Sequence, residues 1–124
     1  MRVASGSPYE AVIGFSRVVR VGDRALVSGT APIEPGGGCD PDPERQARRC
    51  LEIIVAALGE VGAEPEDVVR TRMYLVDPAD AEAVGRAHAA VFSEARPVAT
   101  MVVVSALLDP AWKVEIEVEA VVSA

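Results

Sequence analysis

The sequence has few aromatic residues, two cysteines and one histidine. Phe, Trp and Tyr together make up 4% of its 124 residues, so the hydrophobic core has to be built mainly from Val, Ala, Leu and Ile. One histidine cannot form a metal centre of clustered histidines. Cys39 and Cys50 match no zinc-ligand spacing, and we interpret them as thiols of a reducing compartment. The sequence therefore predicts no metal site.

Positive charge is also scarce. The chain has 12 Lys and Arg residues against 19 Asp and Glu residues, which gives a formal net charge of −7. Nucleic acids and anionic membranes are bound by basic surfaces, so neither is an expected partner. No apolar run is long enough to span a bilayer, and the first residues lack the apolar centre of a signal peptide. We expect a cytoplasmic protein.

Common catalytic motifs are missing as well. The glycine run Gly36–Gly38 lacks the Lys-Ser/Thr pair of a phosphate-binding loop, and no serine lies in a Gly-x-Ser-x-Gly turn. His88 lies on the apolar side of a predicted helix, and we interpret it as a core or interface histidine rather than a catalytic one. These absences disfavour conventional nucleophile and metal chemistry, and polar binding in a cleft remains.

The hydrophobic periodicity predicts one domain over residues 1–124. Ser16–Val21 and Ala25–Thr30 flank a Gly-Asp turn and predict a hairpin. A helix is expected to begin at Asp42-Pro43 and to end near Gly62. Its apolar residues recur at helical spacing: Ala47, Leu51, Ile54, Leu58 and Val61.

The second half of the chain predicts a strand, a helix and two further strands. In the strand Val68–Val76, the side chains of Val69, Thr71, Met73 and Leu75 should point one way, and those of Arg70, Arg72 and Tyr74 the other. A helix follows Asp77-Pro78, and strands follow at Thr100–Ser105 and Val114–Val122. The order predicts an α+β domain with both helices on one face of a mixed sheet.

The opposite face of this sheet is expected to be partly apolar. We place two groups of residues on it: Leu26, Ser28 and Thr30 from one strand, and Ala99, Met101, Val103 and Ser105 from another. Such a face indicates a subunit interface, although scattered exposed apolar residues would also explain it.

Three glutamates alternate with apolar residues in the last strand. Glu115, Glu117 and Glu119 either form a solvated edge or pair with arginines, for which the candidates are Arg17, Arg70 and Arg72. A glutamate left in an apolar cleft would have a raised pKa and could act as a general acid or base. The sequence leaves these alternatives open.

Several segments, in this order, resemble the RidA/YjgF family, also called the endoribonuclease L-PSP family. They are Val27-Ser28-Gly29-Thr30, the helix Glu44–Leu58, the block Glu66-Asp67-Val68-Val69-Arg70-Thr71, and the strand Val114-Glu115-Ile116-Glu117 that comes after Pro97. Gly6-Ser7-Pro8 and Val84-Gly85-Arg86-Ala87-His88 are similar to one branch of that family. The resemblance covers nearly the whole chain.

The resemblance implies a chorismate-mutase-like α+β fold and a homotrimer whose ligand clefts lie between subunits. Archetypal members hydrolyse enamines and imines such as 2-aminoacrylate to keto acids and ammonia, and they use no cofactor. It further implies that Glu115 and Ser28 are catalytic and that backbone amides around Gly29 and Met101 hold a polar group of the substrate. We also place Arg17 among the substrate-binding residues.

The chain departs from the family pattern at three cleft positions. The substrate-binding arginine of the family's Pro-x-Arg motif is replaced by Ala99, the cleft tyrosine by Phe15, and a helix asparagine by Gly85. Loss of a bidentate arginine contact removes about 2–3 kcal/mol of binding. We therefore expect no efficient 2-aminoacrylate deaminase activity and a more apolar substrate. Arg72 either takes over anion binding or pairs with a C-terminal glutamate.

Several functions agree with this pattern. The first is a hydrolase of the deaminase type with a different substrate. The alternatives are a non-catalytic ligand-binding or regulatory trimer, and a dedicated catalyst of a biosynthetic or catabolic pathway. Ribonuclease activity is disfavoured by the acidic charge balance and the lack of a second histidine.

Overall fold

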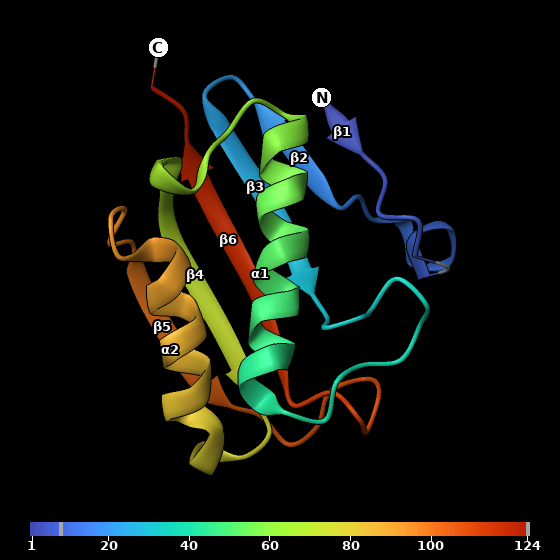
Figure 1. Cartoon of the computed structure of the whole chain (residues 1–124). Helices are drawn as coiled ribbons and strands as arrows, with labels where there is room; N and C mark the ends of the chain where they lie inside the picture. Colours follow the sequence, from blue (N-terminus) through green and yellow to red (C-terminus); the bar gives the residue numbers. More distant parts are fainter. Residues whose placement is uncertain (8, 124) are drawn as a thin grey trace.

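A six-stranded sheet with two helices on one face forms the protein (Figure 1), and the mixed sheet with both helices on one face is as the sequence predicts. The computed structural model describes residues 1–7 and 9–123; Pro8, part of the family-like N-terminal segment, lies outside them. The strands run in the order β1-β2-β3-β6-β4-β5, and only β4 and β5 are parallel to each other. The fold is therefore α+β with a mixed sheet.

The elements have the following bounds. The strands are β1 (Arg2–Val3), β2 (Val18–Val21), β3 (Arg24–Thr30), β4 (Val68–Leu75), β5 (Val98–Val103) and β6 (Val114–Val121). The helices are α1 (Pro43–Glu60) and α2 (Ala81–Phe92). Short helical turns precede β2 (η1, Glu10–Gly14), β4 (η2, Pro65–Asp67) and α2 (η3, Pro78–Asp80). The predicted order is confirmed, with β1 and the short turns added.

Helix α1 begins and ends as its sequence predicts. The side chain of Asp42 accepts a hydrogen bond from the backbone N–H of Arg45 at 2.9 Å, and Pro43 is the first helical residue. After the helix, Gly62 adopts a φ of +79°, which glycine adopts without strain. All five residues of the predicted apolar stripe are buried against the sheet: Ala47, Leu51, Ile54, Leu58 and Val61.

Strand β6 lies at the centre of the sheet and organises both of its faces. Val114, Ile116 and Val118 are buried under the helices. The intervening residues Glu115, Glu117 and Glu119 point to the other face and are partly buried. The predicted alternation is confirmed, and it separates an apolar core from a charged sheet face.

At two places a shift in strand register puts residues on the opposite face of the sheet from the one predicted. The register shifts between Val68 and Arg70, so Val68 is buried while Val69 is 44% exposed. It shifts again between Val27 and Thr30, and Thr30 is fully buried opposite Ile116 instead of joining Leu26 on the open face. A bulge inserts a residue and reverses the alternation, which a strict period of two cannot predict.

The predicted side of strand β5 is wrong. Ala99, Met101 and Val103 pair with Thr71, Met73 and Leu75, which belong to the helix-covered face, and Met101 packs against the core. Their neighbours Val98, Thr100 and Val102 share the open face instead. Pairing with β4 sets the direction of these side chains, and the sequence of β5 alone does not contain that information.

His88 has the structural role expected from its position on α2. Its Nε2 lies 2.8 Å from the Thr71 hydroxyl, and its ring contacts Phe92. Burial lowers the pKa of His88. The two cysteines are free thiols. Among the described residues, no helix is long and apolar enough to cross a membrane.

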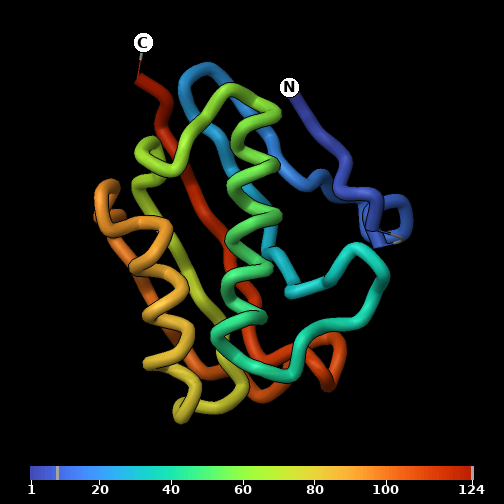
Figure 2. Tube along the Cα trace, viewed as in Figure 1, coloured from blue at the N-terminus to red at the C-terminus, as the bar shows by residue number. Residues whose placement is uncertain are grey.

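Three segments that are distant in sequence gather at one end of the sheet. In Figure 2 the connection from β3 to α1 lies between the η1 segment and the connection from β5 to β6, and residues of all three line one cavity. The residues on which the family resemblance depends most, Ser28, Gly29 and Glu115, lie at this end.

Candidate functional site

The gathered segments line an open cavity of about 1100 Å³. Its apolar walls include Phe15, Ile33, Ile53, Leu108 and Trp112. Its polar groups include Arg17, Ser28, Arg49 and Glu115. Ligand sites typically combine an apolar lining with a few converging polar groups, and this cavity has that character.

A second hollow of about 670 Å³ lies between α1 and α2. It is lined by apolar side chains such as Leu51, Val55 and Val91, with Arg48 and Glu52 among its lining residues. Among its lining residues there is no hydroxyl-bearing side chain beside these two charged groups. The cavity at the end of the sheet is therefore the candidate site.

Glu115 is a partly buried carboxyl in the wall of the cavity. Its carboxylate lies against the backbone at Gly29: a Cβ atom added to Gly29 would be 2.7 Å from Glu115 Oε2. Burial raises the pKa of Glu115, the negative charge of Glu117 raises it further, and Arg17 lowers it. A carboxyl with a raised pKa, at the wall of a cavity, can exchange protons with a bound molecule.

Arg17 and Ser28 are held together next to Glu115. Arg17 Nη1 donates to the hydroxyls of Ser28 and Thr30 at 3.2 and 2.7 Å. The Ser28 hydroxyl and the Ser28 backbone N–H both donate to the Arg17 carbonyl, at 3.3 and 3.0 Å. Burial lowers the pKa of Arg17, while Glu10 and Glu115 raise it; a guanidinium nevertheless stays charged at neutral pH. The cavity thus contains a fixed cation and hydroxyl beside a titratable carboxyl.

Gln46 joins two of the cavity loops, and sequence reasoning missed it. Its fully buried side-chain amide donates to the carbonyls of Asp40 and Ala111 at 2.8 and 3.0 Å and accepts from Lys113 N–H at 2.7 Å. These bonds fix both loops to α1. The sequence does contain a signal for this role, because Gln46 directly precedes Ala47, a member of the buried apolar stripe. Trp112, the only tryptophan, was also missed as a wall residue.

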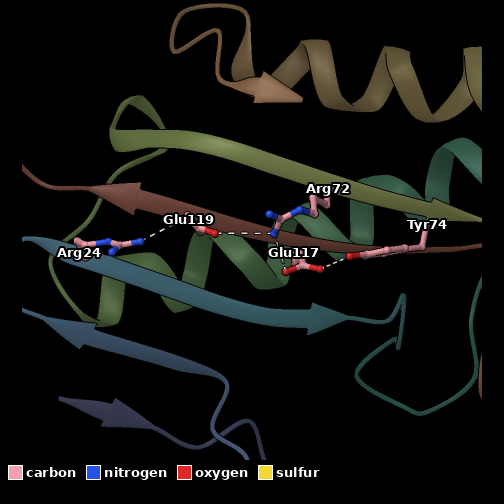
Figure 3. A network of polar contacts seen from close by, with 5 residues as sticks. All are labelled: Arg24, Arg72, Tyr74, Glu117 and Glu119. Carbon is pink, nitrogen blue, oxygen red and sulfur yellow. Dashed lines mark hydrogen bonds and ion pairs between the residues drawn. The ribbon is translucent and has the colours of Figure 1, made fainter. Parts of the chain in front are cut away.

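The other glutamates of β6 belong to a network on the open face of the sheet (Figure 3). Arg72 Nη1 lies 3.5 Å from Glu117 and 3.8 Å from Glu119, which also pairs with Arg24 at 3.4 Å. Tyr74 donates its hydroxyl hydrogen to Glu117. Arg72 is therefore the partner of C-terminal glutamates, one of the two roles that the sequence left open. Glu115 forms no ion pair with any described residue, and this distinguishes it from its neighbours.

The chain brings five of the expected site residues to the cavity and leaves four away from it. Phe15, Arg17, Ser28, Gly29 and Glu115 line the cavity. Arg72 lies in the network of the open face, Gly85 lies within α2 with open space around its Cα, and Ala99 and Met101 lie on the edge strand β5. No cluster of His, Cys, Asp or Glu side chains that could hold a metal occurs in residues 1–7 and 9–123.

Comparison with known proteins identifies the family to which the chain belongs. The family model described as Endoribonuclease L-PSP matches residues 6–122. The chain belongs to the RidA/YjgF family. The crystal structure of Rv2704 from Mycobacterium tuberculosis, described as a member of the YjgF/YER057c/UK114 family, superimposes with a TM-score of 0.91 at 43% identity and covers 98% of both chains.

Two curated relatives of this RidA/YjgF protein extend the comparison. SCO2049 of Streptomyces coelicolor is 42% identical, over 96% of this chain and 90% of its own length. A Salmonella typhimurium protein named 2-iminobutanoate/2-iminopropanoate deaminase is 30% identical, over 74% of this chain and 73% of its own. The family and the fold that the sequence resemblance implied are confirmed.

Gly29→Ala is expected to displace the Glu115 carboxylate. The added Cβ cannot share space with Oε2, and the side chain has to turn toward water. Because burial is the main cause of the raised pKa, the pKa of Glu115 should fall toward 4.5. Carboxyl ¹³C NMR titration measures this change. Gly36→Ala is the matched control, because nothing lies within 4 Å of its added Cβ. An unchanged pKa in Gly29→Ala would contradict the assigned contact.

Proposed function

We propose that this RidA/YjgF protein is a cofactor-free hydrolase of the deaminase type that acts on an imine or enamine more apolar than 2-aminoacrylate. The observation that carries the proposal is the Glu115 carboxyl, with its raised pKa, beside Ser28 and Gly29 in a largely apolar cavity. The Salmonella relative named for imine deamination supports the reaction class.

The reaction adds water to a carbon–nitrogen double bond. Glu115 takes a proton from water while the water oxygen bonds to the imine carbon, and passes that proton to the nitrogen. The hydroxyl of the resulting carbinolamine then loses its proton and forms the C=O bond as the C–N bond breaks, so both protons of the water end on the nitrogen. The products are a ketone and ammonia, with no change of oxidation state. Ser28 and the backbone N–H groups around Gly29 are proposed to orient the polar end of the substrate.

The apolar walls favour a substrate with a larger side chain than the three-carbon 2-aminoacrylate. Phe15 replaces a hydroxyl-bearing tyrosine and Ala99 replaces the arginine of the family's Pro-x-Arg motif, so two polar contacts to a small substrate are gone. A cavity of about 1100 Å³ would be poorly filled by so small a molecule. Burial of apolar surface would contribute to the binding of such a substrate.

The proposed assembly is a homotrimer with clefts between subunits. Leu26, Val98 and Val102, on the face opposite the helices, are 40%, 61% and 40% exposed in the single chain. Four expected site residues lie away from the cavity of their own chain, so only a neighbouring copy could bring them near it. Both observations support a subunit interface on the open face and the β5 edge.

The reaction is tested with imines that an amino-acid oxidase generates from phenylalanine and from alanine. The protein should accelerate hydrolysis of the phenylalanine-derived imine at least roughly tenfold more than that of the alanine-derived one. Pyruvate release from 2-aminoacrylate should stay near background, with the Salmonella deaminase as the positive control. Glu115→Gln should abolish the acceleration.

The pH dependence provides an internal check on this experiment. A base whose pKa is raised loses activity as the pH falls through that pKa, so the acid limb should lie above 4.5. Glu117→Gln removes a negative charge that raises the pKa of Glu115 and should move the limb to lower pH. Turnover of 2-aminoacrylate at the rate of the Salmonella enzyme, or full activity of Glu115→Gln, would contradict the proposal. Ligand binding without any turnover would favour the non-catalytic binder.

Sedimentation equilibrium tests the assembly. With 13.0 kDa per chain, the trimer mass is 3 × 13.0 = 39.0 kDa. Val102→Glu, which puts a charge on the open face, should dissociate it, because burying an unpaired carboxylate is costly. Ala89→Glu on the exposed side of α2 is the matched control and should leave the mass unchanged. A monomer in the wild type would overturn the proposed assembly.

A further inference from the structure

The Arg17 guanidinium is a charged group of the cavity to which the proposed reaction gives no role. Its Nη1 is bonded to the hydroxyls of Ser28 and Thr30. Its Nε is buried, and no described residue accepts a hydrogen bond from it. No carboxylate of the described residues forms an ion pair with Arg17, although Glu10 and Glu115 are close enough to affect its pKa. A partly buried cation that lacks an anionic partner costs free energy.

Arg49, the second arginine of the cavity, has different contacts from those of Arg17. Arg49 Nε donates to the Ile33 carbonyl at 2.8 Å and lies 3.9 Å from a Glu34 carboxylate oxygen. Glu34 is therefore an acidic neighbour of Arg49, at the edge of ion-pair distance. Of the two arginines in the cavity wall, Arg17 is the one that forms no ion pair with a carboxylate of the described residues.

The position of Arg17 suits a ligand site rather than a core ion pair. The hydroxyls of Ser28 and Thr30 hold the guanidinium at the cavity wall without neutralising it, because hydroxyls carry no charge. A planar guanidinium matches the two oxygens of a carboxylate, and such charge-assisted bonds are roughly twice as strong as neutral ones. Arg17 and Glu115 form no ion pair, so an anion at Arg17 and a proton-exchanging group at Glu115 can coexist.

We propose that Arg17 binds the anionic group of the ligand, and that the ligand is a carboxylate whose apolar body lies against Phe15 and Trp112. This inference rests on the proposed function, because it specifies that the imine substrate carries a carboxylate group. The anion anchor of the cavity then belongs to the same chain as Glu115. It differs in position from the missing arginine, which the family resemblance places at Ala99 on strand β5.

The apolar part of the ligand follows from the walls of the same cavity. Phe15 and Trp112 present aromatic surface, and Ile33, Ile53 and Leu108 add aliphatic surface. A carboxylate without an apolar body would leave these walls in contact with water. An apolar molecule without an acid would leave the Arg17 charge uncompensated. The chemical class that satisfies both is an aryl- or alkyl-substituted carboxylate.

Trp112 fluorescence tests this inference directly, because it is the only tryptophan and lines the cavity. The intact protein is titrated with phenylacetate and with phenylacetamide, which share an apolar body and differ in charge. Phenylacetate should bind about tenfold more tightly, the effect expected for a charged hydrogen bond. Arg17→Gln should abolish this preference, and Arg17→Lys should reduce it without abolishing it.

The matched control is Arg49→Gln, which removes the other arginine of the same cavity, the one with Glu34 as an acidic neighbour. This change should leave the preference for phenylacetate unchanged. Equal affinities in the wild type, no binding of either probe, or loss of the preference in Arg49→Gln would each overturn the inference. If Arg17→Gln does not fold, the ratio of phenylacetamide to phenylacetate dissociation constants is compared between the wild type and Arg17→Lys. Equal ratios in these two proteins would overturn the inference.

The outcome is separable from that of the proposed function. Imine hydrolysis without a preference for phenylacetate overturns the anchor alone. A preference for phenylacetate that depends on Arg17, without hydrolysis of any imine tested, supports the anchor and overturns the catalytic proposal.

Discussion

The close approach of the Glu115 carboxylate to the backbone at Gly29 is the contact on which the site depends. Only a residue without a Cβ leaves room for Oε2 there, because an added carbon would be 2.7 Å away. The contact keeps the carboxyl beside β3, where burial raises its pKa and where Ser28 and Arg17 are within the same cavity. Strand β6 supplies this geometry, since its inward residues fix it under the helices while its glutamates point to the other face.

The three glutamates of β6 share one pattern and have two different roles. Glu117 and Glu119 form ion pairs with Arg72 and Arg24 on the open sheet face. Glu115, at the loop-bearing end of the strand, has Gly29 as its neighbour and no ion pair with a described residue. Position along the strand therefore separates the carboxyl that lines the cavity from the two that lie in ion pairs. The nearby cation, Arg17, is held by hydroxyls and stays available to an anionic ligand.

Much of this could be predicted from the sequence, and the failures have physical causes. The periodicity of α1 and β6, the Asp42 cap and the Gly-Asp turn are local signals, and each was confirmed. The faces of Val69 and Thr30 were wrong because β-bulges shift the alternation by one residue. The face of Ala99, Met101 and Val103 was wrong because their direction depends on pairing with β4, which is a long-range property.

The site was only partly accessible to sequence reasoning for the same reason. Ser28, Gly29 and Glu115 were found through family resemblance, whereas Gln46 and Trp112 acquire their roles only when distant loops meet. The central claim is that Glu115 is a carboxyl held in a partly buried, proton-exchanging state. Its pKa in the intact wild-type protein, measured by carboxyl ¹³C NMR, tests that claim most directly. The account predicts an inflection clearly above 4.5, and an inflection at or below 4.5 would contradict it.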